Sequence, residues 1–217
     1  MASRRSAEAR RPPTRLYLFT PRIGDPRLFV DKLQSALAGG DIAALLLRVE
    51  SDGDEEVRST VAALAPRIQR HEAALLLDRR PQLAASLNAD GAHLPGVDAL
   101  KRALADLKPE RIAGVGGLKT RHDAMIAAES GADYVMFGEP DAAGLRPAFA
   151  AVLERVSWWA ELFEVPCVGY AAGFEEIGPL ASSGADFIAL GDWVWEGDVG
   201  TAIRNAAAAI ESAEAPR

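Results

Sequence analysis

The chain has 217 residues, with 24 Lys and Arg against 31 Asp and Glu, which gives a formal net charge of -7 and an isoelectric point of about 5.1. Apolar residues make up 49% of the chain and charged residues 25%, a composition typical of a soluble globular protein and not of a disordered or fibrous one. An acidic protein repels phosphodiester backbones, and no apolar run approaches the roughly 20 residues of a membrane span. We therefore expect neither nucleic acid nor a membrane as a partner.

Residues 1–14 are rich in Arg and Ser, and no apolar segment of a secretory signal follows them. We expect a flexible tail there and a second short tail over residues 214–217, with a transit peptide as the alternative for the N-terminus. The single cysteine, Cys167, cannot form an internal disulfide and stands in an apolar run, as buried cysteines do. It predicts a reducing, cytoplasmic location.

Between these tails, short apolar runs alternate with longer amphipathic stretches. Most of the runs are continuously apolar, as expected for parallel strands that are covered on both faces. Eight strands are predicted, at residues 15–20, 43–48, 73–78, 91–95, 112–117, 134–138, 166–171 and 187–191. The clearest helices between them are predicted at residues 26–38, 55–70, 120–130, 145–163 and 200–213.

A turn of small residues recurs before three of the strands, as Ala89-Asp90-Gly91, Gly131-Ala132-Asp133 and Gly184-Ala185-Asp186. Each turn places Gly or Asp where a helix must stop and the chain must enter the sheet. Eight such strand–helix units predict an α/β fold, a single-domain (β/α)8 TIM barrel over residues 15–213. An open doubly wound sheet is the alternative, but residues 20–24 after the first strand lack its G-x-G-x-x-G fingerprint.

Active sites of (β/α)8 barrels lie at the C-terminal ends of the strands, so the residues that close each strand are the candidates. Arg48 closes the second strand, where it could bind a phosphate or carboxylate with two hydrogen bonds, or form a structural ion pair with Glu50 or Asp78. Asp78 closes the third strand and could hold a hard cation, or it could fix Arg48. Arg79 and Arg80 follow it directly.

The other strand ends offer a candidate phosphate site and two histidines. Small residues over 171–173 would let backbone N–H groups approach a phosphate, which barrels commonly bind after strands seven and eight. After the eighth strand, Gly191 is followed by Asp192, whose negative charge disfavours an anion. His93 is interpreted as a structural, hydrogen-bonded residue and His122 as an exposed residue on the first turn of a helix.

Four tryptophans stand in two pairs. Trp193 and Trp195 follow the eighth strand, and Trp158 and Trp159 lie in the sixth predicted helix. The first pair could cover the pocket, pack in the core or contact a second copy of the chain. The second pair could likewise bury one ring against a partner, so a homodimer is left open.

Several of these pieces together resemble the thiamine phosphate synthase and thiazole tautomerase family of barrels, over about residues 16–210. The matching pieces are Leu16-Tyr17-Leu18 with Thr20, Ala89-Asp90-Gly91-Ala92-His93-Leu94, Gly131-Ala132-Asp133-Tyr134-Val135 with Phe137-Gly138, and Gly184-Ala185-Asp186. The resemblance implies a ligand that is a small phosphorylated heterocycle. It also implies an activity, the joining of a pyrimidine methyl diphosphate to a thiazole phosphate, in which Mg²⁺ and cationic side chains stabilise the leaving pyrophosphate.

Residue by residue, the match to the family's site is uneven. Its Q-x-R-x-K motif retains Arg48 but has Glu50 in place of the Lys, and its N-D-R motif falls on Asp78-Arg79-Arg80, which places Arg79 at the metal-binding Asp unless a one-residue insertion restores Asp78. The resemblance implies Asp78 and Asp98 as metal ligands. It implies a substrate-binding or phosphate-binding set of Arg48, Arg79, Arg80, Ala171, Ala172, Gly173 and Gly191.

Two further motifs of the family are changed. The family's Ser after the fifth strand is Gly116, and its T-x-T-K loop is replaced by the shorter residues 139–144. Two lost charge-assisted contacts of about 1.5–3 kcal/mol each correspond to about two to four orders of magnitude in rate. We therefore expect weak or lost synthase activity, with a thiazole tautomerase-like isomerase and a non-catalytic barrel that binds a phosphorylated ligand as the alternatives.

Overall fold

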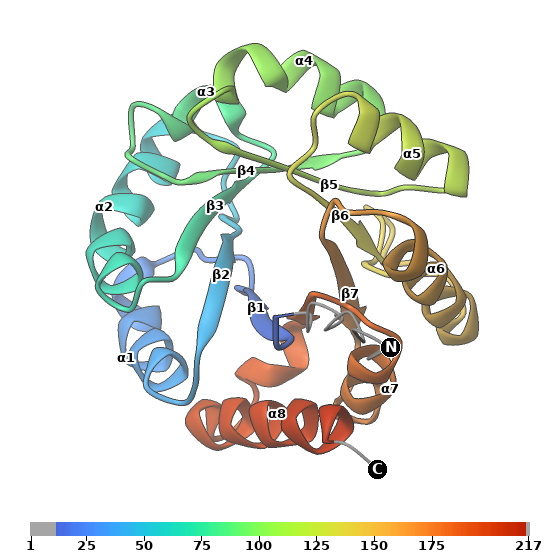
Figure 1. Ribbon diagram of the computed structural model, residues 1–217. Coiled ribbons are helices and arrows are strands. Elements are labelled where there is room, and N and C mark those ends of the chain that lie inside the picture. Colours follow the sequence, from blue (N-terminus) through green and yellow to red (C-terminus); the bar gives the residue numbers. More distant parts are fainter. Residues whose placement is uncertain (1–11, 216–217) are drawn as a thin grey trace, which may run out of the picture.

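Eight parallel strands close into a barrel in chain order, with β1 paired to both β2 and β8. The computed structural model describes residues 12–215, and Figure 1 shows the helices as an outer ring around the strands. The strands are β1 Arg15–Phe19, β2 Ile42–Leu47, β3 Ala74–Asp78, β4 Gly91–Pro95, β5 Ile112–Gly116, β6 Tyr134–Phe137, β7 Cys167–Ala171 and β8 Phe187–Leu190. This topology confirms the predicted (β/α)8 barrel and contradicts an open sheet.

The helices follow the strands one by one. They are α1 Pro26–Leu37, α2 Asp54–Arg70, α3 Pro81–Ala84, α4 Val97–Leu107, α5 Arg121–Glu129, α6 Phe149–Leu162, α7 Ile177–Ser182 and α8 Val199–Glu214, with 3₁₀ turns η1 Phe174–Glu176 and η2 Asp192–Trp195. Helix α5 begins with the capping box that its sequence predicts, between Thr120 and Asp123. No helix in the described part of the chain is long and apolar enough to cross a membrane.

One helix begins later than its sequence pattern predicts. Helix α6 was expected from residue 145 but begins at Phe149, because the preceding segment folds into a loop around Asp141. The Asp141 carboxylate accepts hydrogen bonds from the backbone N–H groups of Ala143 (2.8 Å) and Leu145 (3.0 Å). Such side-chain-to-backbone bonds compete with a helix at its first turn.

The strands are apolar on both faces because each face packs against a different layer. Residues such as Leu45 and Leu47 face the helices, and Leu46 between them faces the barrel interior. Inside, the Tyr17 and Tyr134 hydroxyls lie 2.8 Å apart, and the Tyr134 hydroxyl lies 2.8 Å from His93 Nδ1. His93 is thus buried and hydrogen-bonded, as its interpretation as a structural residue requires.

The three predicted turns have a common structural role that their pattern did not disclose. The carboxylates of Asp90, Asp133 and Asp186 accept hydrogen bonds from the backbone N–H group of the first or second residue of the neighbouring strands, at Leu75 (2.7 Å), Ala113 (2.6 Å) and Cys167 (2.8 Å). Each Asp therefore ties its own strand to the preceding one at the N-terminal end of the barrel. That position favours stability and not catalysis.

The chain ends belong to the same closed unit as far as they are described. Thr14 donates hydrogen bonds to the Ala185 carbonyl (2.7 Å) and to the Glu214 carboxylate (2.8 Å). Helix α8 runs through Glu214, one residue beyond the predicted barrel. The rest of the predicted tails, residues 1–11 and 216–217, lies outside the described residues.

Candidate active site

A cavity of about 450 Å³ opens at the C-terminal ends of the strands. Its floor is the top of the barrel interior and its walls come from the loops after β1 to β6. We call it the central cavity, and its lining residues are Phe19, Arg22, Leu46, Arg48, Asp78, Arg79, His93, Pro95, Gly117, Glu139, Pro140, Asp141, Ala142 and Gly144. Among the predicted site residues, Arg48, Asp78 and Arg79 meet here.

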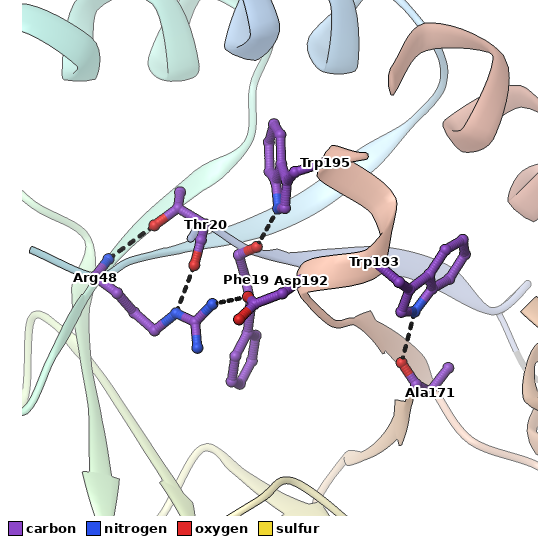
Figure 2. A network of polar contacts seen from close by, with 7 residues as sticks. All are labelled: Phe19, Thr20, Arg48, Ala171, Asp192, Trp193 and Trp195. Carbon is purple, nitrogen blue, oxygen red and sulfur yellow. Dashed lines mark hydrogen bonds and ion pairs between the residues drawn. The ribbon is translucent and has the colours of Figure 1, made fainter. Parts of the chain in front are cut away.

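Arg48 is held from three directions at the rim of this cavity (Figure 2). Its Nε donates to the Thr20 carbonyl (2.5 Å), its guanidinium lies 5.3 Å from the centre of the Phe19 ring, and its Nη2 forms an ion pair with Asp192. The ion-pair partner is therefore Asp192, and neither Glu50 nor Asp78. Glu50 is exposed and does not line the central cavity.

The two tryptophans of η2 close the β8 edge of the same rim. Trp193 Nε1 donates to the Ala171 carbonyl (3.1 Å), and Trp195 Nε1 donates to the Phe19 carbonyl (2.6 Å). These bonds satisfy carbonyls at the ends of β7 and β1, and the Trp195 ring also packs 4.8 Å from that of Phe29. The pair therefore fixes the turn that carries Asp192.

Asp78 lies among several cations. Arg79 Nε is 3.6 Å from its carboxylate, and the side chain of Asp78 is 17% exposed. Burial raises the pKa of the Asp78 carboxyl above its ordinary value, although the charges of Arg79, Arg48, Arg22 and Arg80 act in the opposite direction.

Arg79 and Arg80 point to different surroundings. Arg79 lines both the central cavity and a neighbouring cavity of about 270 Å³, whereas Arg80 lines only the latter. Arg80 Nη2 forms an ion pair with Asp52 at 2.8 Å. Arg79 has φ of 58°, a left-handed backbone that is uncommon for a side chain of this size, and its N–H donates to the His93 carbonyl (3.0 Å).

The predicted metal ligands do not fit Mg²⁺. Asp98 is exposed on the first turn of α4 and does not line the central cavity, where Asp78 lies. Within residues 12–215, no group of three or more His, Cys, Asp or Glu side chains could hold a metal ion. Mg²⁺ requires several oxygen ligands, whereas Asp78 is surrounded by guanidinium groups that repel a dication.

Glu139, which follows the end of β6, also lines the central cavity. Its carboxylate accepts a hydrogen bond from the Gly117 N–H and fills the space that a side chain at Gly116 would need. His93 Nε2 borders the same space, 2.8 Å from where a Cβ of residue 116 would lie. Burial raises the pKa of the Glu139 carboxyl to about 7, although backbone N–H groups that bond to it lower the pKa. The same effect of burial lowers the pKa of His93 to about 3, with Arg79 adding to the shift.

Restoring a serine at Gly116 is expected to destabilise the protein by about 1–3 kcal/mol, because the new side chain must displace the Glu139 carboxylate. In the double variant Gly116→Ser/Glu139→Ala, most of this loss should be recovered. Chemical denaturation of the parent, both single variants and the double variant measures the coupling. Additive changes in the free energy of unfolding would contradict the shared space.

The candidate phosphate site after β7 already binds an internal carboxylate. The Ala172 N–H donates to Glu176 Oε2 (2.8 Å), and Arg146 Nη1 lies 2.9 Å from Glu176 Oε1. Gly191 instead gives room to the Tyr170 hydroxyl, with which a Cβ would clash. Neither Glu176 nor Arg146 was predicted from the sequence. The signal that could have revealed Glu176 is the acidic pair Glu175-Glu176, which begins two residues after the small residues 171–173.

Comparison with known proteins agrees with this architecture. A family model described as thiamine monophosphate synthase matches residues 16–193. A thiamine-phosphate synthase of Rhodospirillum centenum is 40% identical over 191 residues, which cover 87% of this chain and 92% of that protein. The chain belongs to the thiamine monophosphate synthase family. A second thiamine-phosphate synthase, of Hyphomonas neptunium, is 37% identical over 203 residues and covers 88% and 90% of the two chains.

A solved structure of this family shares the fold. The thiamine phosphate pyrophosphorylase of Pyrococcus furiosus matches with a TM-score of 0.76 at 24% identity, over 93% of this chain and 97% of that one. This likeness confirms the fold, and the family model together with the relative from Rhodospirillum centenum confirms the family resemblance inferred from the turns and strands.

Proposed function

We propose that the protein joins a pyrimidine methyl diphosphate to a thiazole phosphate, forming thiamine phosphate and releasing pyrophosphate. The observation that carries this proposal, in a chain of this family, is the convergence of Arg22, Arg48 and Arg79 on one side of the central cavity. Guanidinium groups bind phosphate oxygens with paired hydrogen bonds. We also propose a cytosolic location, which the single cysteine supports because it cannot form an internal disulfide.

In the proposed reaction, the bond between the pyrimidine methylene carbon and the diphosphate oxygen breaks, and its electron pair leaves with the pyrophosphate. The thiazole nitrogen forms the new bond to the methylene carbon. Arg48, fixed by Thr20 and Phe19, is the group that would meet the leaving charge. A preorganised cation stabilises such charge without reorganising during the reaction.

The cavity floor and Glu139 would hold the heterocycle. Phe19 and Leu46 supply apolar contact at the cavity floor, and His93 stays neutral there because of its low pKa. The Glu139 carboxyl, whose pKa is about 7, is protonated at slightly acidic pH and can then donate a hydrogen bond to a ring nitrogen. These groups would orient the pyrimidine with its methylene carbon toward the arginines.

The test is formation of thiamine phosphate from both substrates by the parent and by Arg48→Ala. Loss of one charge-assisted contact of about 1.5–3 kcal/mol is expected to lower kcat/KM for the diphosphate about tenfold or more. Arg70→Ala is the matched control, because Arg70 is exposed at the last residue of α2, at the opposite end of the barrel. Equal activity of parent and Arg48→Ala would remove Arg48 from the site, and no product from the parent would refute the proposed function.

A further inference from the structure

We propose that Arg22, Arg48 and Arg79 form a diphosphate-binding site that needs no metal ion. The inference rests on the proposed function for the identity of its ligand, a diphosphate ester or pyrophosphate. It differs from the family resemblance, which implies Mg²⁺ held by Asp78 and Asp98.

The first argument is the charge at the cavity wall. Arg22, Arg48 and Arg79 line the central cavity together with Asp78, and Asp192 pairs with Arg48 at its rim. These three cations therefore share their wall with Asp78 and Asp192, whereas the other two carboxylates that line the cavity, Glu139 and Asp141, follow β6. A bound metal would require added carboxylates at this wall, whereas the sequence has placed a guanidinium at residue 79.

The second argument is the freedom of two of these cations. Arg22 is exposed and has no carboxylate within ion-pair distance in the described part of the chain. Arg79 is 49% exposed and reaches Asp78 only through a 3.6 Å contact of its Nε, so its terminal nitrogens remain able to bind another anion. Arg48 is different, because it is 15% exposed and anchored at its Nε. The site therefore combines one fixed cation with two that can adjust to a ligand.

The third argument is the backbone at Arg79. A φ of 58° is unfavourable for a residue with a long side chain, and strained backbone is retained where surrounding contacts impose it, often at ligand sites. Here the Arg79 N–H is bound to the His93 carbonyl at the end of β4. This bond fixes the turn that carries the guanidinium to the boundary between the two cavities.

The test is calorimetric titration of the parent with inorganic pyrophosphate, once in buffer with EDTA and once with excess Mg²⁺. We expect binding in EDTA and no tightening when Mg²⁺ is added. Arg79→Ala should weaken binding in EDTA by about tenfold or more, since a charge-assisted contact contributes about 1.5–3 kcal/mol. Arg70→Ala, which removes the same charge at the far end of α2, should bind as the parent does.

Arg79→Asp provides a second, opposite readout. It removes the cation and places a carboxylate next to Asp78, so pyrophosphate binding should be lost in EDTA and should become dependent on Mg²⁺. Circular dichroism and the melting temperature establish whether each variant is folded. If Arg79→Ala or Arg79→Asp does not fold, Arg79→Lys is titrated in its place. Its affinity for pyrophosphate is expected to lie between the affinity of the parent and the affinity expected for Arg79→Ala.

Three results would overturn the proposal: pyrophosphate binding by the parent only with Mg²⁺, binding under neither condition, or unchanged binding by Arg79→Ala in EDTA. These outcomes are separate from the fate of the proposed function. Metal-free pyrophosphate binding without thiamine phosphate formation would support the site and refute the synthase activity. Mg²⁺-dependent pyrophosphate binding together with thiamine phosphate formation would refute the metal-free site and support the synthase activity.

Discussion

Thiamine phosphate formation by this protein is expected to be about two to four orders of magnitude slower than by a family member that retains the Q-x-R-x-K and T-x-T-K motifs. We expect the loss of rate to arise mainly at the candidate phosphate site after β7, which would hold the thiazole phosphate. There the Ala172 N–H is already bonded to Glu176, and Arg146, just after the loop of residues 139–144, is paired with the same carboxylate. Two missing charge-assisted contacts of about 1.5–3 kcal/mol each account for this range.

Steady-state kinetics with each substrate varied in turn measures this prediction. We expect the loss in kcat/KM to be larger for the thiazole phosphate than for the pyrimidine diphosphate, since the arginines remain at the diphosphate end. Glu176→Ala frees both the Ala172 N–H and Arg146 and should raise kcat/KM for the thiazole phosphate. Glu164→Ala, an exposed carboxylate in the turn before β7, is the control. A rate of thiamine phosphate formation equal to that of a family member with both motifs would contradict the expectation.

The barrel could be predicted from the sequence because its signal is local and repeated. Eight apolar runs and three Asp-containing turns each report on a few consecutive residues, and parallel strands joined by helices leave few ways to connect them. The predicted bounds of the strands differ from the observed ones by one residue or less at each end. The start of α6 was wrong because Asp141 binds the backbone of the loop instead of continuing a helix.

The sequence could predict only those site residues whose position follows from the end of a strand. That Arg48 and Asp78 would face the same cavity follows from the barrel rule, but the partner of Arg48 does not. Asp192 lies 144 residues away in the chain and reaches Arg48 only because β8 closes onto β1. Likewise, the vacancy at Gly116 and the carboxylate of Glu139 appear in the sequence as two unrelated departures. Only their geometry shows that one fills the space left by the other.

Glu139 also makes the stability of the protein depend on pH in a way that a single substitution can isolate. The pKa of its carboxyl is about 7 in the folded protein, against an ordinary value of 4.5. Between these values the folded state holds a proton that the unfolded state has lost, so the contribution of Glu139 to stability falls as the pH rises. A shift of this size corresponds to about 3 kcal/mol across the window.

Glu139→Gln is therefore expected to stabilise the protein relative to the parent by about 3 kcal/mol more above pH 7 than below pH 4.5. Glutamine keeps an acceptor for the Gly117 N–H but carries no titrating proton. Urea denaturation of parent, Glu139→Gln and the exposed control Glu164→Gln at both ends of this pH range gives the difference.

The comparison must be made between variants, because His93 acts in the opposite sense in each of them. Its pKa of about 3 lies below the ordinary 6.5, so the folded state stays neutral while the unfolded state binds a proton, and stability rises with pH through that window. Asp78, Tyr17, Tyr134 and Tyr170 are also titratable groups around the Glu139 carboxyl, and they too are common to both proteins. In the parent, the fall in stability with pH that Glu139 causes offsets the rise that His93 causes. In Glu139→Gln only the rise in stability caused by His93 remains. Parallel pH profiles for the two proteins would mean that the Glu139 carboxyl is solvated and ionises at its ordinary pKa.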